Sequence, residues 1–424
     1  MVIRYGLNEI HNLETLADGE LKDALKCVSR SPINSRTSAP KGSSEYSCPT
    51  YPSLRQHKLR NILVQLYLDF SIPGNMKALQ WDKIAGKLSL INKDVPGAKD
   101  LTSGYILIKV AYAGICGTDL HIIQKEFRSA DKVILGHEFS GTVVKIGPNV
   151  DHVKVGNKVV VDPNSHCDQC RFCYRGQPNF CSKGLAVSIG VCKDGGFSDY
   201  CLVPAKHVIK LPDSFPLDKG ALCEPYSCII RGWDNLGTIS DDSQILILGA
   251  GIIGLLWASL FHHHGYYDVT ITEISEGRRK LAMGLNLGYQ VHHPDDVQRK
   301  FAGVDTGLEG YDIIVDCTGV PKAIESAFPL LRCGGKFCMF GCCPKVSEIT
   351  INPADIMLKE LTIVGSQVNP FTISKAVSLV NNMSERYLDF ERLGIGFYSL
   401  EKYEEAMQML KTGQISKAMF AFDN

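Results

Sequence analysis

The chain has 424 residues, and its 45 lysines and arginines balance its 45 acidic residues, so the formal net charge is zero. This balance argues against a nucleic-acid binder or a membrane-surface binder, which usually carries a basic excess. Apolar residues make up 45% and charged residues 21%, which is ordinary for a globular protein of two or three domains.

Two further observations concern the compartment. No apolar run reaches the roughly 20 residues of a membrane span, and residues 1–25 lack a basic start followed by an apolar core, so they do not form a secretory leader. The 16 cysteines are mostly scattered, as in a protein of a reducing compartment. We therefore expect a cytoplasmic protein.

The first 75 residues differ in composition from the rest. Residues 28–56 are rich in Ser, Pro and Arg and predict an unstructured segment, whereas residues 60–70 could form a short helix or strand. From Met76 the pattern MKALQWDKIAGKLSL alternates and predicts a first strand. We expect 1–75 to be a disordered extension, either preceding the natural start at Met76 or serving as an arm.

From 76 to 225 the chain contains short strand patterns broken by Gly, Pro and Asp. They are YILIKVAYAGI, SGTVVKIG, NKVVVDP and SDYCLVP, which predict an all-β or partly open barrel domain.

From 226 to 370 apolar runs alternate with helical patterns. The runs are QILILGAG, DVTITEI, YDIIVDCTG, GKFCMFG and LTIVGSQV. Buried parallel strands produce such continuous runs, so the segment predicts a doubly wound α/β nucleotide-binding domain of the Rossmann type. Residues 371–424 contain a helical stretch and a final strand, KAMFAF.

A glycine-rich turn follows the first of these strands. Gly249, Gly251, Ile253 and Gly254 belong to G-A-G-I-I-G, which opens a helix, and the next strand ends at Glu273. In this context the first glycine allows a tight turn, the second lets the backbone approach a pyrophosphate, and the third lets helix and strand pack closely.

The acid at the end of the second strand bears on the choice of cofactor. Glu273 would accept hydrogen bonds from ribose hydroxyls and repel a 2′-phosphate, so we expect NAD rather than NADP. Arg278 lies nearby in the sequence and could soften that preference.

Four cysteines form a C-x2-C-x2-C-x7-C cluster. They are Cys167, Cys170, Cys173 and Cys181. Four thiolates can close a tetrahedral zinc site to water, which makes the site structural. An iron–sulfur cluster is the alternative, but no Cys-Pro follows and a predicted dinucleotide-binding domain adjoins, which favours zinc.

Upstream segments carry a second set of metal-ligand types. Cys116 lies in GICGTDLHI and His137 in GHEFSG, and mixed sulfur and nitrogen ligands suit zinc. Glu138 could be the third ligand or an orienting residue, and Glu224 in the segment CEP is a further candidate. Catalytic zinc keeps one position open.

At these residues the chain resembles the zinc-containing medium-chain dehydrogenases over residues 76–424, closest to the sorbitol and arabinitol dehydrogenases. The resemblance implies a GroES-like catalytic domain (76–225, completed by 371–424) and a Rossmann coenzyme domain (226–370). It implies two zinc ions per chain, with Cys116, His137 and Glu138 around the catalytic one and Glu224 bound directly or through water. It also gives Thr118 and His121 the positions of a proton relay.

The resemblance further implies the reaction and its alternatives. It points to an NAD-dependent oxidation of a polyol's secondary alcohol to a ketose, by a homo-oligomer, dimeric or tetrameric. Sorbitol dehydrogenases carry an Arg where this chain reads GSQVNPF (365–371), which favours an arabinitol-type substrate. The alternatives are an L-threonine dehydrogenase or another zinc alcohol dehydrogenase, and a non-catalytic NAD-binding protein. The counterpart of Glu224 in threonine dehydrogenases tends to be Asp, and the ligand candidates all persist here.

Two remaining groups of residues have simpler interpretations. The run His262, His263 and His264 is expected at a solvated helix end. Cys342 and Cys343 follow a strand and are expected to be packing residues.

Overall fold

The computed structural model describes residues 72–422. The chain divides at Gly74, and residues 75–424 form one compact unit. The extension predicted for 1–75 lies, up to residue 71, outside the described residues, as does the short helix or strand considered at 60–70. No helix within residues 72–422 is long and apolar enough to cross a membrane.

The described chain begins with a hairpin. The pattern expected to form one strand from Met76 forms two antiparallel strands, β1 (Asn75–Asp82) and β2 (Lys87–Asp94), with Trp81 opposite Leu88. The reason is the turn between them, where Gly86 has φ 66°. With β4 (Lys132–Ile134) these strands form a three-stranded sheet in the order β2-β1-β4.

A seven-stranded sheet holds the other strands predicted before residue 225. Its order is β15-β16-β3-β5-β6-β8, with β7 paired to β3, and its pairs are antiparallel except β15 with β16. Its strands are β3 (Tyr105–Gly114), β5 (Glu138–Ile146), β6 (Lys158–Val161), β7 (Tyr200–Pro204), β8 (Val208–Lys210), β15 (Ile395–Tyr398) and β16 (Lys417–Ala421). The C-terminal strands thus complete a sheet begun about 300 residues earlier, as Lys417 illustrates through its separation of 302 residues from Ile115.

A six-stranded parallel sheet holds the continuous apolar runs. Its order is β11-β10-β9-β12-β13-β14, so the chain crosses over at β9 and builds outward in both directions. Its strands are β9 (Ile245–Leu248), β10 (Val269–Thr272), β11 (Gln290–His292), β12 (Tyr311–Asp316), β13 (Leu331–Met339) and β14 (Thr362–Gly365). The predicted doubly wound sheet is confirmed.

Helices cover this sheet. The helices of this part of the chain are α9 (Ile252–His263), α10 (Glu276–Gly284), α11 (Pro294–Lys300), α12 (Thr306–Glu309), α13 (Pro321–Ala327) and α14 (Pro353–Leu358). Helix α9 is apolar almost all round because it is buried against the sheet, and Leu255, Trp257 and Phe261 are fully enclosed.

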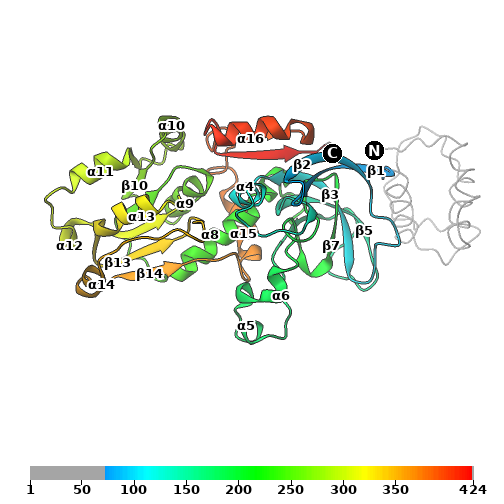
Figure 1. Ribbon diagram of the computed structural model, residues 1–424, viewed down its shortest axis with the longest axis horizontal. Helices are drawn as coiled ribbons and strands as arrows, with labels where there is room; N and C mark the ends of the chain where they lie inside the picture. The colour runs from blue at the N-terminus through cyan, green and yellow to red at the C-terminus, as the bar shows by residue number, and fades with distance from the viewer. Residues whose placement is uncertain (1–71, 423–424) are drawn as a thin grey trace, which may run out of the picture. The chain divides into compact units, whose positions relative to one another are not determined.

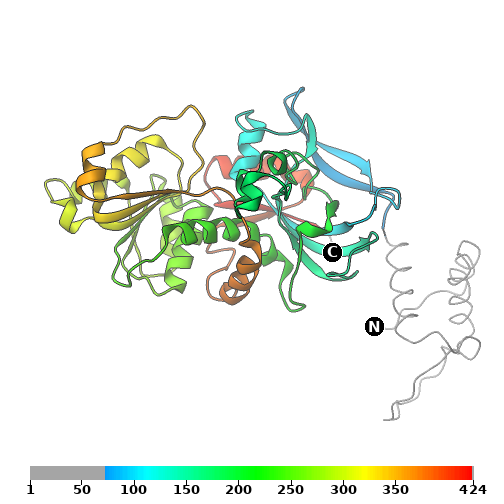
Figure 2. The same cartoon turned by 90° about the horizontal axis from the view of Figure 1, so that it is seen from below.

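Two helices join the two larger sheets. Helix α8 (Cys223–Leu236) packs against α15 (Ile373–Met383), and Figures 1 and 2 show both between the six-stranded sheet and the seven-stranded sheet. Both are amphipathic, and their apolar faces enter one core that also contains residues of both sheets. The first turn of α8 carries Glu224 into this junction.

The other helices are short or peripheral. They are α4 (Gly117–Ile123), α5 (Arg171–Tyr174), α6 (Ser182–Leu185), α7 (Leu217–Gly220) and α16 (Tyr403–Lys411). Figure 1 shows α5 and α6 in a lobe that projects from the sheets.

Candidate metal and dinucleotide sites

The glycine-rich turn has the geometry that its sequence predicts. Gly249 follows β9 with φ 97°, a conformation that L side chains rarely adopt. A Cβ at Gly254 would lie 1.9 Å from the carbonyl oxygen of Gly249, so only glycine permits this contact between helix and turn. A Cβ at Gly251 would meet no protein atom within 4 Å, and Ile253 lies in the first turn of α9. The helix N-terminus is therefore open to a phosphate group.

Glu273 lies directly beside this turn. Its carboxylate accepts hydrogen bonds from the backbone N–H of Ala250 at 2.9 Å and of Ser275 at 2.8 Å, and the residue is buried. Each carboxylate oxygen retains a second lone pair for a hydroxyl donor. The acid is thus fixed at the edge where a ribose would lie next to the glycine turn.

The two neighbouring arginines differ in their contacts. Arg278 packs against the C-terminal segment, where a Cβ at Gly413 would lie 3.3 Å from its Nε. Arg279 donates from Nη1 to the carbonyl oxygens of Glu273 and Ile274, both at 2.8 Å. Arg279, which sequence reasoning missed, is therefore fixed on the backbone of Glu273 and the residue after it.

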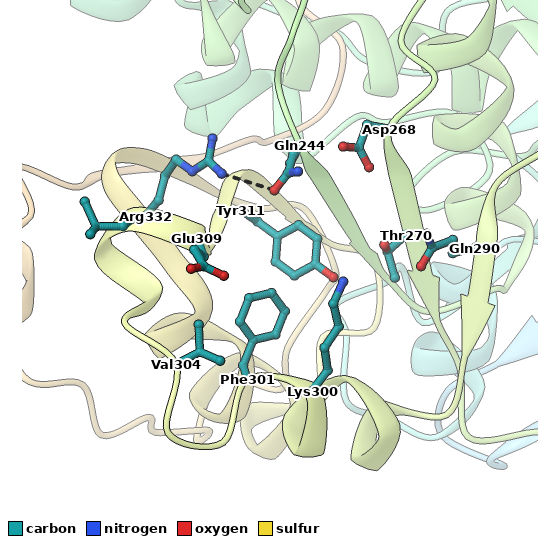
Figure 3. Close-up of a pocket in the computed structure, with 11 residues that line it drawn as sticks. Gln244, Asp268, Thr270, Gln290, Lys300, Phe301, Val304, Glu309, Tyr311 and Arg332 are labelled. Atoms are coloured by element: carbon teal, nitrogen blue, oxygen red, sulfur yellow. Dashed lines mark hydrogen bonds between the residues drawn. The ribbon is translucent and has the colours of Figure 1, made fainter.

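A cavity of about 290 Å³ lies at the opposite edge of the parallel sheet. Figure 3 shows its lining, in which Gln244, Asp268, Gln290 and Tyr311 precede or begin their strands. Because the glycine turn follows the carboxyl end of β9, this cavity is not the dinucleotide site.

Three of the predicted metal ligands come together. Cys116 precedes α4, His137 directly precedes β5, and Glu138 begins β5. One ligand atom from each residue lies within 4.8 Å of the others. His137 and Glu138 are buried and Cys116 is partly buried. A sulfur, an imidazole nitrogen and a carboxylate at this spacing fit a zinc ion with an open position.

Asp119 contacts two of the three ligand residues, Cys116 and His137. It is fully buried, accepts a hydrogen bond from the N–H of Cys116 at 2.9 Å, and places its other oxygen 3.4 Å from Nδ1 of His137. Burial alone would lower the pKa of His137, but the Asp119 carboxylate and Cys116 raise it well above its usual value. A carboxylate on Nδ1 leaves Nε2 for a metal. Sequence reasoning missed Asp119, although C-G-T-D contains it.

Lys417 supplies a positive charge on the other side of Glu138. Its Nζ contacts Oε2 of Glu138 and donates to the carbonyl oxygen of Ile115 at 3.2 Å, and both charged side chains are 2% exposed. A Cβ at Gly114 would lie 2.5 Å from Oε2 of Glu138 and 2.7 Å from Cε of Lys417. The ion pair therefore needs glycine at position 114.

Glu224 lies near the cluster but outside its three-residue core. It is buried, and its Oε1 accepts a hydrogen bond from the thiol of Cys228 at 3.6 Å. Burial raises the pKa of Glu224 to about 7, His137 opposes the rise, and Glu138 adds to it. The charges of His137 and Glu138 thus act on Glu224, and its helix α8 contacts β5, the strand that Glu138 begins.

The two predicted relay residues lie on α4. Thr118 is partly exposed, and Nδ1 of His121 lies 2.7 Å from Oε2 of Glu126, with the two side chains 27% and 47% exposed. Glu126, which the sequence motif does not reach, thus connects His121 to solvent.

The carboxyl edge of the parallel sheet faces the metal-ligand cluster. A Cβ at Gly249 would lie 2.9 Å from Cγ2 of Thr318, and one at Gly319 would lie 2.3 Å from the carbonyl oxygen of Cys342. Asn369, which follows β14 at the carboxyl end of the same sheet, donates to Ser227 in α8, and Ser227 donates to the carbonyl oxygen of Glu224. Helix α8 also contacts β5, the strand that begins with Glu138. The glycine turn and the turn that carries Glu224 therefore lie at the same edge of the sheet.

The four-cysteine cluster lies in the projecting lobe. The Sγ atoms of Cys167, Cys170, Cys173 and Cys181 lie within 4.8 Å of one another, and Cys181 is completely buried. Cys173 Sγ is 3.5 Å from that of Cys170 and 4.0 Å from that of Cys167. Four sulfurs at this spacing fit a tetrahedral ion.

Two simpler expectations had different outcomes. The histidine run lies at the end of α9 with His263 and His264 exposed, as expected. His262 also hydrogen-bonds to the hydroxyl of Tyr387 at 2.9 Å, and the ring of His264 stacks on Trp233. The expectation that Cys342 and Cys343 are packing residues is wrong, because both are exposed in the loop after β13.

Family models match both parts of the unit. Residues 102–213 match the alcohol dehydrogenase GroES-like domain, and residues 253–382 match the zinc-binding dehydrogenase model. The first match confirms the GroES-like fold predicted for the segment after residue 76.

Relatives of known activity cover nearly all of this unit. The chain is 31% identical to D-arabinitol dehydrogenase 1 of Uromyces fabae, over 82% of this chain and 97% of the relative. It is 32% identical to L-threonine 3-dehydrogenase of Pyrococcus abyssi, over 81% of this chain and 98% of the relative.

A solved structure has the same fold. It is a zinc-binding dehydrogenase from Sinorhizobium meliloti 1021 bound to NADP, 32% identical, with a TM-score of 0.74, covering 82% of this chain and 100% of that one.

Proposed function

The chain belongs to the zinc-dependent medium-chain alcohol and polyol dehydrogenase family, and on that premise we propose that it oxidises a secondary alcohol of a polyol to a ketose with NAD. The observation that carries the proposal is the cluster of Cys116, His137 and Glu138, together with a glycine turn at the sheet edge that also meets the turn of Glu224. A hydride acceptor bound at that turn can extend toward a substrate held at the cluster.

The residues of the cluster have separate roles. Cys116, His137 and Glu138 would hold the catalytic zinc, with Glu224 as a direct or water-bridged partner. The zinc, when bound, would supply a Lewis acid that lowers the pKa of the substrate hydroxyl. Asp119 fixes the ring of His137 through Nδ1, and Lys417 fixes Glu138.

A proton path leads away from the cluster along α4. Thr118 would take the hydroxyl proton, and His121 would pass it outward with Glu126 as its partner at 2.7 Å. Because both His121 and Glu126 are partly exposed, the proton can leave to water from there.

The cofactor is proposed to be NAD. Glu273 is fixed beside the glycine turn, where a negative charge would bind ribose hydroxyls and repel a 2′-phosphate. The NADP in the Sinorhizobium relative makes NADP the alternative that must be tested.

The proposed substrate class is a pentitol of the arabinitol kind. The 31% identity to an arabinitol dehydrogenase supports it, and so does the absence of Arg from residues 365–371. L-Threonine is the second candidate because of the 32% identity to the Pyrococcus enzyme. Glu224 favours the polyol, because the residue at this position in threonine dehydrogenases tends to be Asp.

The four-cysteine lobe is proposed to hold a second, structural zinc, which gives two per chain. A homo-oligomer, dimeric or tetrameric, and a cytoplasmic location also remain proposals from the sequence.

A substrate screen tests the proposal. The protein, with its zinc content measured in parallel, is assayed at 340 nm with sorbitol, xylitol, D- and L-arabinitol, arabinitol phosphate, threonine and ethanol, each with NAD and NADP. Two zinc ions and NADH from a pentitol are the expected result. Turnover of threonine or ethanol alone would overturn the polyol assignment, and a zinc content near zero without turnover would indicate the non-catalytic alternative.

A further inference from the structure

One buried amide joins three segments that are far apart in the sequence. Asn369, which follows β14, is 0% exposed. Its Oδ1 accepts a hydrogen bond from Nδ2 of Asn164 at 2.6 Å, and its Nδ2 donates to Oγ of Ser227 at 2.7 Å. Asn164 follows β6 of the seven-stranded sheet and Ser227 lies in α8, so the amide links both sheets and the helix between them.

The link continues to Glu224. The hydroxyl of Ser227 donates to the carbonyl oxygen of Glu224 at 2.6 Å, within the first turn of α8. Thr372 donates from Oγ1 to the carbonyl oxygen of Ser227 at 2.7 Å and lies 3.0 Å from the carbonyl oxygen of Asn369. Two side chains that follow β14, those of Asn369 and Thr372, thus hold the turn that carries Glu224.

The backbone around Asn369 shows that its position is enforced. Val368 has φ 47° and Phe371 has φ 62°, a region that side chains other than glycine rarely adopt, least of all β-branched ones. Such conformations persist only where surrounding contacts determine them. Asn369 holds this loop through its bonds with Asn164 and Ser227 and a longer one to Oδ1 of Asp162 at 3.4 Å, and Thr372 adds its bond to Ser227.

We infer that Asn369 is a positioning residue, which acts through Ser227 to hold the Glu224 turn toward Cys116, His137 and Glu138. The inference rests on the role proposed for Glu224 at the catalytic metal. A buried network that served stability alone would leave the geometry at the metal unchanged when one of its members was removed. Mutating a residue that orients a metal ligand typically lowers activity or metal affinity by about 10- to 100-fold.

The variants are Asn369→Ala and Ser227→Ala in the full chain loaded with Co²⁺, whose visible absorption reports the coordination of the metal. Asn235→Ala is the matched control, because Asn235 also connects α8 to the end of β14, with its Nδ2 3.0 Å from the carbonyl oxygen of Gly365, but lies on the surface. If Asn369→Ala fails to fold, Ser227→Ala still tests the inference, because it removes the link between Asn369 and Glu224.

We expect Asn369→Ala and Ser227→Ala to shift the absorption bands of the catalytic cobalt and to leave those of the four-cysteine site unchanged. On the alcohol that wild type oxidises, kcat should fall by about 10- to 100-fold, with the KM for NAD within two-fold. The kcat of the double variant should equal that of the less active single variant, because both side chains act through one chain of hydrogen bonds.

The control should match wild type. An unchanged cobalt spectrum in the folded variants, or losses that multiply in the double variant, would overturn the inference. Because the spectrum requires no turnover, a shift without activity on any alcohol would support the positioning role while refuting the proposed reaction.

Discussion

Lys417 and Glu138 form a buried ion pair, although 279 residues separate them in the sequence. Burial alone would lower the pKa of Lys417, but the Glu138 carboxylate raises it. The lysine therefore stays charged, and Glu138 is held between it and the proposed metal.

Lys417→Met is expected to destabilise the metal-free protein more than the zinc-loaded protein. Removing one partner leaves a buried carboxylate uncompensated, which typically costs about 3–5 kcal/mol. A zinc ion beside Glu138 would supply the missing positive charge. The measurement is the unfolding free energy of variant and wild type, each with zinc and with chelator. Equal losses in the two states would contradict the proposed place of the metal.

Cys173→Ser should remove the zinc of the lobe alone. We expect one zinc per chain instead of two, and faster proteolysis within residues 165–187, because a closed metal site stabilises the chain around it. Cys333→Ser is the control, because Cys333 is an exposed free cysteine. Two zinc ions bound to Cys173→Ser would show that these cysteines do not form the site.

Glu273→Gln should weaken the preference for NAD. The amide keeps the size of the side chain but removes the charge that repels a 2′-phosphate, so the ratio of kcat/KM for NAD to that for NADP should fall by about tenfold or more, or roughly 1.4 kcal/mol. Initial rates with both cofactors measure it. An unchanged ratio would assign cofactor selection to another residue, Arg279 first.

Asp162→Asn tests the pH dependence of stability. Burial raises the pKa of Asp162 from 3.8 to about 6, although hydrogen bonds from Asn164 and Asn369 oppose the rise. A carboxyl whose pKa is raised on folding adds stability below pH 3.8, and this contribution is lost as the pH rises through about 6.

Asparagine resembles the protonated acid at every pH. The unfolding free energy of wild type relative to Asp162→Asn should therefore fall between pH 4 and pH 7, by on the order of 3 kcal/mol. Urea unfolding at several pH values measures the difference. A difference that stays flat, or that grows with pH, would contradict this assignment.

Motifs of short spacing were predictable from the sequence. The glycine turn and the four cysteines each lie within one short stretch of the chain, so their spacing alone fixes much of their geometry. The parallel sheet was predictable because buried strands leave continuous apolar runs, as in ILIL of β9.

Contacts between distant segments were not predictable. Lys417 begins the strand β16, and nothing near it in the sequence identifies Glu138 as its partner. Asn369 is similar, because its partners Asn164 and Ser227 lie 205 and 142 residues away. Asp119 could have been found, since an acid in the first turn after Cys116 suits the helix N-terminus.

The most direct test of the catalytic metal centre is the turnover and zinc content of Cys116→Ser. We expect the variant to keep one zinc per chain, in the four-cysteine lobe, and to bind NADH as wild type does. Its NADH formation at 340 nm should fall by at least about 10³-fold, because the Lewis acid is lost. Normal turnover by Cys116→Ser would contradict the account and place the reaction elsewhere in the molecule.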